Sequence, residues 1–112
     1  ADPSLVILRI ADPSGLRVGG RLSARDAALF REALAGLREA KLAAGARLDI
    51  SNSQRVELFT ADGVLGKLGE DQALRSKIVY FGQLLQGLRA AGRRPLSIDL
   101  RVPDKPSYLP LD

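Results

Sequence analysis

The sequence has no cysteine and no histidine among its 112 residues. Without cysteine the chain forms no disulfide and no thiolate metal site, and without histidine it has no imidazole ligand, no His-based catalytic triad and no imidazole acid–base group. An enzyme built from this chain would have to work with carboxylates, lysine, serine or tyrosine. The composition therefore argues against the commonest catalytic and zinc-binding classes.

Aromatic residues and long apolar runs are also scarce. Aromatic residues make up 4 % of the chain, too few for a platform on which single-stranded nucleic acid stacks. No apolar run approaches the roughly 20 residues of a membrane span, and no signal peptide is recognisable. Because the chain starts with Ala1 instead of methionine, we expect a piece of a longer protein or a processed product.

What the chain does contain fits one folded domain over residues 1–112. Apolar residues amount to 46 %, and this length supports one real core but not two. The net charge of +4 comes from 17 basic and 13 acidic residues. The cations are spread along the chain and mostly alternate with acids, and Arg93-Arg94 is the one adjacent basic pair. A solvated surface is therefore favoured, with a basic nucleic-acid-binding α+β domain as the alternative.

The first fifty residues predict a strand, a helix and a second short strand. The apolar run at 4–10 is typical of a strand, and turn residues at 12–15 and a Gly19-Gly20 loop follow it. Ser23 is suited to cap the next helix. That helix has one apolar stripe, and residues 46–50 form the next candidate strand. The stripe consists of Phe30, Ala33, Leu34 and Leu37.

The middle of the chain predicts a hairpin followed by a long amphipathic helix. Two apolar runs at 55–60 and 64–68 flank a short loop that contains Asp62-Gly63, a strong hairpin signal. We expect Glu70-Asp71 to form the acidic start of a helix over 73–91. Its apolar positions are spaced by four and three residues, as on one face of a helix. They are Leu74, Ile78, Phe81, Leu85 and Leu88.

The end of the chain predicts two strands. Side chains alternate along residues 96–102, so we expect an apolar face and a polar face. The apolar face has Leu96, Ile98, Leu100 and Val102, and the polar face has Ser97, Asp99 and Arg101. A turn at 103–106 leads to a last strand over 107–111, where Pro110 is tolerable only at an edge. The predicted order, β-α-β-ββ-α-ββ, indicates an α+β domain with a mixed or antiparallel sheet and two main helices on one face.

Two motifs could suggest an enzyme, but simpler interpretations are favoured. Gly63 and Gly66-Lys67 resemble a phosphate loop only faintly, because the glycine spacing is wrong and no helix begins there. A glycine-containing hairpin strand is the better interpretation. Asp99 and Arg101, at i and i+2 on one strand face, are more simply a surface ion pair than a catalytic pair. We therefore expect no catalytic residue, no metal site and no cofactor.

Tyr108 has two interpretations that the sequence leaves open. In one, the ring folds back on the sheet with its hydroxyl in water. In the other, Tyr108 is an anchor at a binding edge, because tyrosine offers a large contact area at low entropic cost. Terminal strands with unpaired amides and carbonyls can accept another chain by strand addition.

The order of motifs in the second half resembles the extracytoplasmic C-terminal β domain of the FtsQ/DivIB family. The segments that carry the resemblance are Val56-Glu57-Leu58, Asp62-Gly63, Lys67-Leu68-Gly69, a helix containing Lys77, the stretch Ile98-Asp99-Leu100-Arg101-Val102-Pro103 and a short last strand. The resemblance covers residues 53–110 well and residues 4–50 more loosely. Known members have an aromatic residue where Val102 stands, and Pro103 and Pro106 interrupt the turn here.

The resemblance implies a non-enzymatic component of the bacterial divisome. Family members are anchored by one membrane helix and have a POTRA domain before this β domain, which lies outside the cytoplasm. They scaffold other bitopic division proteins of the FtsB/DivIC and FtsL type, and a partner segment adds to the terminal strands. Carried over, the partner-binding residues are Arg101, Val102, Ser107, Tyr108 and Leu109.

Overall fold

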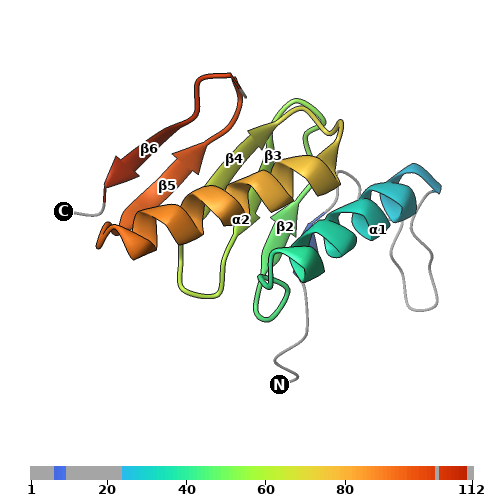
Figure 1. Ribbon diagram of the computed structural model, residues 1–112. Helices are drawn as coiled ribbons and strands as arrows, with labels where there is room; N and C mark the ends of the chain where they lie inside the picture. The colour runs from blue at the N-terminus through green and yellow to red at the C-terminus, as the bar shows by residue number, and fades with distance from the viewer. Residues whose placement is uncertain (1–6, 10–23, 103, 111–112) are drawn as a thin grey trace.

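Six strands and two helices make up the described part of the chain, which in this computed structural model comprises residues 7–9, 24–102 and 104–110. The order of elements is the one that the sequence predicts (Figure 1). In chain order they are β1 (Ile7–Arg9), α1 (Ala24–Glu39), β2 (Arg47–Asp49), β3 (Val56–Phe59), β4 (Leu65–Gly69), α2 (Leu74–Ala90), β5 (Pro95–Asp99) and β6 (Ser107–Pro110).

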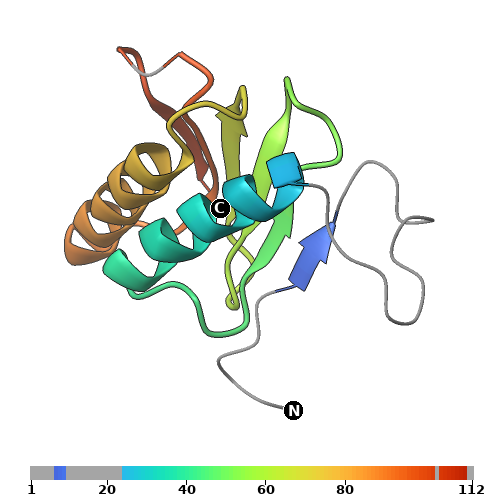
Figure 2. The same cartoon turned by 90° about the vertical axis from the view of Figure 1, so that its right-hand side faces the viewer.

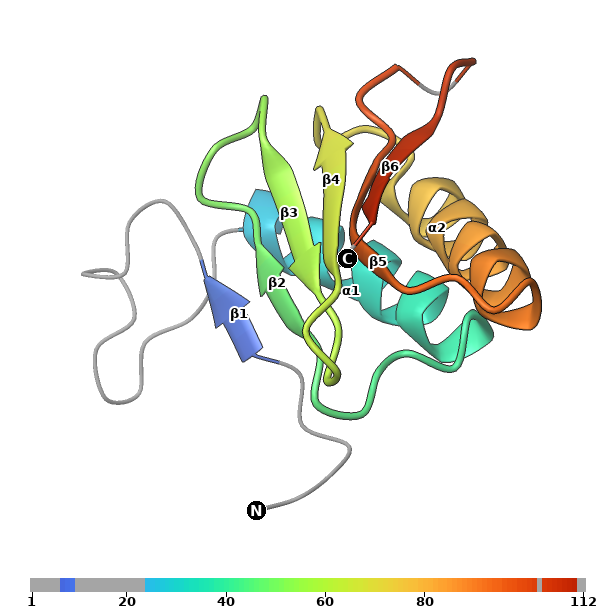
Figure 3. The same ribbon diagram turned by 90° about the vertical axis from the view of Figure 1, so that its left-hand side faces the viewer.

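The strands form one mixed sheet in which they lie in chain order from β1 to β6. The pairs β1–β2 and β4–β5 are parallel and the other neighbours are antiparallel. A parallel pair needs a crossover, and α1 and α2 lie in these two connections. Both helices cover the same face, and Figures 2 and 3 show the sheet from opposite sides. The predicted α+β class with helices on one face is confirmed.

The core lies between the helices and this face of the sheet. The predicted stripe of α2 is buried at Leu74, Ile78, Phe81 and Leu85, and α1 contributes Ala33 and Leu37. Close approach of α2 requires glycine on β4, because a Cβ built on Gly66 would lie 2.8 Å from Cε2 of Phe81. Strand residues and Leu100, which directly follows β5, complete the core; the strand residues include Leu48, Val56, Leu58, Leu68 and Ile98.

The predicted acidic start of the second helix is wrong. Helix α2 begins at Leu74 after Ala73, whose φ of 53° is left-handed, and its first turn has no acidic residue and no side-chain cap. Asp71 is used elsewhere, since its amide donates to the Ser53 carbonyl (2.9 Å) and its carboxylate binds Arg25. Residues 70–73 therefore form an irregular connection. The helix ends at the C-cap residue Ala91, and the next residue, Gly92, has a φ of 75°, while the Arg93 amide donates to the Leu88 carbonyl.

The predicted alternation along 96–102 is only partly correct. Ile98 and Leu100 are buried, but Leu96 is 44 % exposed and Val102 58 % exposed, whereas Ser97 is buried. The pairing with β6 shifts register between Pro95 and Ser97, which moves Leu96 off the inner face. The strand also ends at Asp99, so Arg101 and Val102 lie beyond it.

The remaining predicted strands are present, β4 shifted by one residue and the others slightly shorter. Residues 46–50, 55–60, 64–68 and 107–111 correspond to β2, β3, β4 and β6, and the run at 4–10 contains β1. Four predicted features lie outside the described residues: the turn at 12–15, the Gly19-Gly20 loop, the Ser23 cap and Pro103 in the last turn. Neither described helix combines the length and apolar character of a membrane span.

Candidate partner-binding edge

Strand β6 is the last strand of the sheet and has a neighbour on one side. It pairs with β5 so that Tyr108 is opposite Ile98 and Leu109 is opposite Ser97. Within the described part of the chain no strand pairs with its outer side (Figure 3). All four of its residues are exposed. An unpaired strand edge of this kind offers main-chain donors and acceptors to another chain.

Two prolines limit the length of this edge. Pro106 precedes β6 and Pro110 ends it, and neither has an amide hydrogen. The amides of Ser107, Tyr108 and Leu109 are the donors between them, and alternate amides of a strand point to opposite sides. At most about two donors therefore face outward, so a partner could form only a short ladder here. Side-chain contacts must supply much of any affinity.

Tyr108 and Leu109 lie on opposite faces of the sheet. Tyr108 faces the helix side, since its partner Ile98 is a core residue, and Tyr108 itself is 37 % exposed. Its hydroxyl accepts a hydrogen bond from Nη1 of Arg93 (3.3 Å). The hydroxyl thus contacts a residue that follows α2, and part of the Tyr108 surface stays open. Leu109, 55 % exposed, extends from the face without helices.

An apolar row crosses the sheet face without helices and ends at Leu109. In register from β3 to β6, this row contains Phe59, Leu65, Ser97 and Leu109. Phe59 and Leu65 are half-buried, and the guanidinium of Arg47 lies 5.7 Å from the centroid of the Phe59 ring. This row cannot be recognised from the sequence alone, because it depends on the register of four strands. Its one signal in the sequence is that Phe59 and Leu65 alternate with buried residues.

Arg101 and Val102 lie in the segment between β5 and β6, which corrects their predicted place on the penultimate strand. Nη2 of Arg101 lies 2.7 Å from Oδ2 of Asp99, and the Arg101 amide donates to Oδ1 of the same carboxylate (2.9 Å). These hydrogen bonds hold the pKa of Asp99 below its usual value, the side-chain bond from Arg101 having the largest effect. The ion-pair interpretation of these two residues is confirmed.

A shallow cavity brings part of the predicted site together. It has a volume of about 410 Å³ and is lined by Asp99, Arg101, Val102, Lys105 and Ser107. Tyr108 lies instead at a cavity of about 370 Å³ with Arg93 and Arg94. The predicted partner-binding residues therefore lie on β6 and in the segment before it, and they do not line one common cavity. This arrangement provides main-chain hydrogen bonds and apolar contacts along an edge.

The glycine motif that faintly resembles a phosphate loop has a structural role. Gly66 and Lys67 lie within β4 of a β-hairpin, with Gly66 against the Phe81 ring, as the hairpin interpretation predicts. The loop of this hairpin is held by Thr60, whose hydroxyl accepts from the Val64 amide (3.0 Å) and contacts Asp62. In the described ranges no group of three or more acidic side chains is placed to hold a metal ion.

Comparison with protein families gives one match. The family model for "Cell division protein FtsQ/DivIB, C-terminal" matches residues 7–101. This range includes both helices and strands β1 to β5, and it ends at Arg101, before β6. Neither the curated proteins nor the solved structures give a significant match.

Proposed function

This chain belongs to the FtsQ/DivIB C-terminal family of cell-division proteins, and we propose that it is a binding domain of a divisome scaffold rather than an enzyme. In this proposal residues 1–112 are one domain of a longer protein that has a POTRA domain and a single membrane helix before it, and the domain lies outside the cytoplasm. Its partners are division proteins of the FtsB/DivIC and FtsL type.

The observation that carries the proposal is the open outer edge of β6 with exposed apolar side chains beside it. A partner segment would add to β6 as a seventh strand, and its successive side chains would lie alternately beside Tyr108 and Leu109. Because the ladder is short, the apolar contacts would determine the strength of binding. Val102 and Ser107 extend the contact area toward the cavity at Asp99.

Nucleic-acid binding, the alternative suggested by the net charge, has less support. Arg25, Arg75, Arg89 and Arg101 each form an ion pair with a carboxylate of the chain. Contacts with phosphates would weaken steeply as salt is raised, whereas strand addition would weaken much less. A salt titration of partner binding and of a DNA probe separates the two functions.

The direct test uses Tyr108→Asp and Val102→Asp in the 112-residue chain. The ligand is the extracytoplasmic segment of the FtsB/DivIC-type protein from the same genome, and binding is measured by isothermal titration calorimetry. Each change places a charge where an apolar contact is expected, so we expect at least about tenfold weaker binding. Thermal unfolding should change little, because both side chains are substantially exposed.

Gln86→Asp is the matched control, since it adds the same carboxylate to an exposed position of α2 away from β6. It should bind as the unchanged chain does. Normal binding by both Tyr108→Asp and Val102→Asp would show that the partner does not use this edge.

A further inference from the structure

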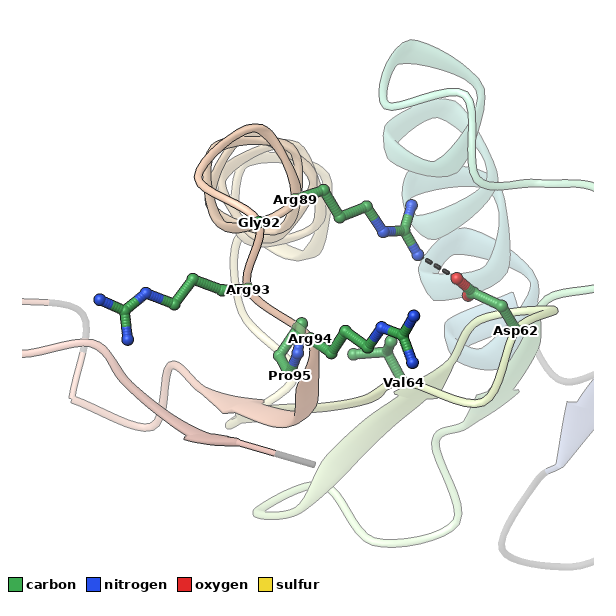
Figure 4. A pocket seen from close by; sticks show the side chains of 7 residues that line it. All are labelled: Asp62, Val64, Arg89, Gly92, Arg93, Arg94 and Pro95. Carbon is green, nitrogen blue, oxygen red and sulfur yellow. Dashed lines mark hydrogen bonds and ion pairs between the residues drawn. The ribbon is translucent and has the colours of Figure 1, made fainter. Parts of the chain in front are cut away.

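A groove with three arginines lies at the C-terminal end of α2 (Figure 4). One part of it, about 520 Å³, is lined by Asp62, Val64, Arg89, Gly92, Arg93, Arg94 and Pro95. The other part, about 370 Å³, is lined by Gly92, Arg93, Arg94, Tyr108 and Pro110. Residues 92–94 line both parts, and we call the two parts together the arginine groove. It extends from the β3–β4 hairpin to the end of β6.

The charges in the arginine groove are not balanced. Arg89 forms an ion pair with Asp62, the one carboxylate among the residues that line the groove. The hydroxyl of Thr60 and, to a smaller extent, Arg89 hold the pKa of Asp62 below its usual value, so this carboxylate stays ionised. Within the described residues Arg93 and Arg94 form no ion pair, and the Arg93 guanidinium donates a hydrogen bond to the Tyr108 hydroxyl. Two positive charges are therefore open to a ligand.

The open charges lie directly beside the proposed strand-binding edge. Pro95, next to Arg94, is opposite Pro110 in the register of β5 and β6. Figure 4 shows the Arg94 side chain directed toward Val64 and Asp62, and the Arg93 side chain directed away from them. A chain that pairs with β6 and continues past Pro110 would therefore reach the part of the groove that is lined by Arg93, Arg94 and Tyr108.

We propose that the arginine groove binds an acidic segment, rich in Asp or Glu, that is contiguous with the partner strand on β6. This inference rests on the proposed function and adds the chemistry of the partner to it. Guanidinium groups bind carboxylates with paired hydrogen bonds. Arg89 with Asp62 already shows this chemistry within the same groove. Carboxylates of the partner would take the equivalent place at Arg93 and Arg94.

An acidic peptide fits the groove better than a membrane or a nucleic acid. The site is concave, whereas an anionic lipid surface needs a broad, exposed basic face. Asp62 sits in the groove and would repel a closely spaced row of phosphates. Separate carboxylates on flexible side chains can reach Arg93 and Arg94 and avoid Asp62.

The test is an NMR titration of the ¹⁵N-labelled 112-residue chain with acetylated hexaglutamate. We expect amide shifts concentrated at residues 62–64, 92–94 and 108. The variant with Arg93→Gln and Arg94→Gln should bind about five- to tenfold more weakly. A matched variant, Arg31→Gln with Arg38→Gln, removes the same charge from exposed positions of α1 and should bind as the unchanged chain does.

Three results would overturn the inference. Amide shifts spread over all basic surfaces would mean that hexaglutamate responds only to net charge. Equally weakened hexaglutamate binding in both double variants would mean the same. Binding of phosphatidylglycerol vesicles through Arg93 and Arg94, without binding of hexaglutamate, would assign the groove to a membrane surface.

Different results would overturn the proposal of partner binding at β6 and the proposal for the arginine groove. Leu109 lies on the sheet face opposite Tyr108, so Leu109→Asp should leave hexaglutamate binding unchanged while it weakens capture of the FtsB/DivIC-type segment. If Leu109→Asp weakens that capture and the Arg93/Arg94 double variant does not, the edge is supported and the groove inference is wrong. If the groove binds hexaglutamate but Leu109→Asp has no effect on the division partner, the edge proposal is wrong instead.

Discussion

The sheet under α2 and the strand β6 form two contrasting regions of one structure. The residues that α2 turns toward the sheet are almost fully inaccessible, Phe81 at 0 % and Leu85 at 1 % exposure, whereas every residue of β6 is exposed. Burial of apolar area is the main source of folding free energy. Stability is therefore concentrated in the helix–sheet layer, and a terminal strand that adds little to it is available for binding.

A single row of residues shows the transition between the two regions. Leu58, Gly66, Ile98 and Tyr108 are in register across β3 to β6 on the helix side. The first three are buried, and Tyr108 is partly open at the end of α2. The row continues the core to the edge of the sheet, where its last member is partly exposed. Matched substitutions in the two regions test this difference in burial.

The largest contrast in stability is expected between two leucines. Leu85→Ala removes a buried side chain and should lower the free energy of unfolding by about 2–5 kcal/mol. Leu109→Ala makes the same chemical change on β6, where the side chain is 55 % exposed, and should lower it by less than about 1 kcal/mol. Urea unfolding followed by circular dichroism measures both. If both variants lowered the free energy of unfolding equally, β6 would be part of the folding core, contrary to this prediction.

An intermediate effect is expected from adding volume to β4. Gly66→Val would push a side chain into the Phe81 ring and should destabilise the fold by about 1–3 kcal/mol. Ser107→Val adds a β-branched residue to the exposed strand β6 and should change stability by no more than about 0.5 kcal/mol. Thermal unfolding of both variants checks this pair. A neutral Gly66→Val would show that α2 does not press on β4 as described.

The smallest effect is expected in the dependence of stability on pH. The folded-state pKa of Asp99 is lowered, so its ion pair with Arg101 contributes stability above the unfolded pKa of about 3.9, and this contribution is lost as pH falls through the folded pKa. Asp99→Asn should cost about 0.5 kcal/mol at pH 7 and flatten the decline in stability below about pH 4.

Asp104→Asn is the control for Asp99→Asn, because Asp104 is exposed and belongs to none of the ion pairs between described residues. It should leave both stability and its acid dependence nearly unchanged. If the two variants behave alike in chemical unfolding between pH 2 and 7, the Asp99–Arg101 pair contributes nothing measurable.

Local patterns in the sequence predicted the order of all elements and both helix stripes, since each depends only on spacing along one segment. The predictions were wrong where contacts between distant segments determine the local structure. Glu70-Asp71 reads as a helix start, but Asp71 is held by Ser53 and Arg25. Leu96 reads as an inward residue, but a bulge beside Pro95 turns it out.

The candidate site was predictable in part. Its strand follows from the Pro-flanked terminal sequence, and the ion pair of Asp99 with Arg101 follows from their i, i+2 spacing, whereas the sequence leaves the placement of Tyr108 open. The closeness of Arg93 to Tyr108 and the apolar row that ends at Leu109 do not follow, because they depend on the register between β5 and β6.

The central claim, that β6 receives a partner strand, is tested most directly by amide hydrogen exchange in the presence and absence of the FtsB/DivIC-type segment. We expect slower exchange at the outward-facing amides between Pro106 and Pro110, with little change in α2. Unchanged exchange on β6, with protection appearing at β1 or on the helices instead, would contradict it.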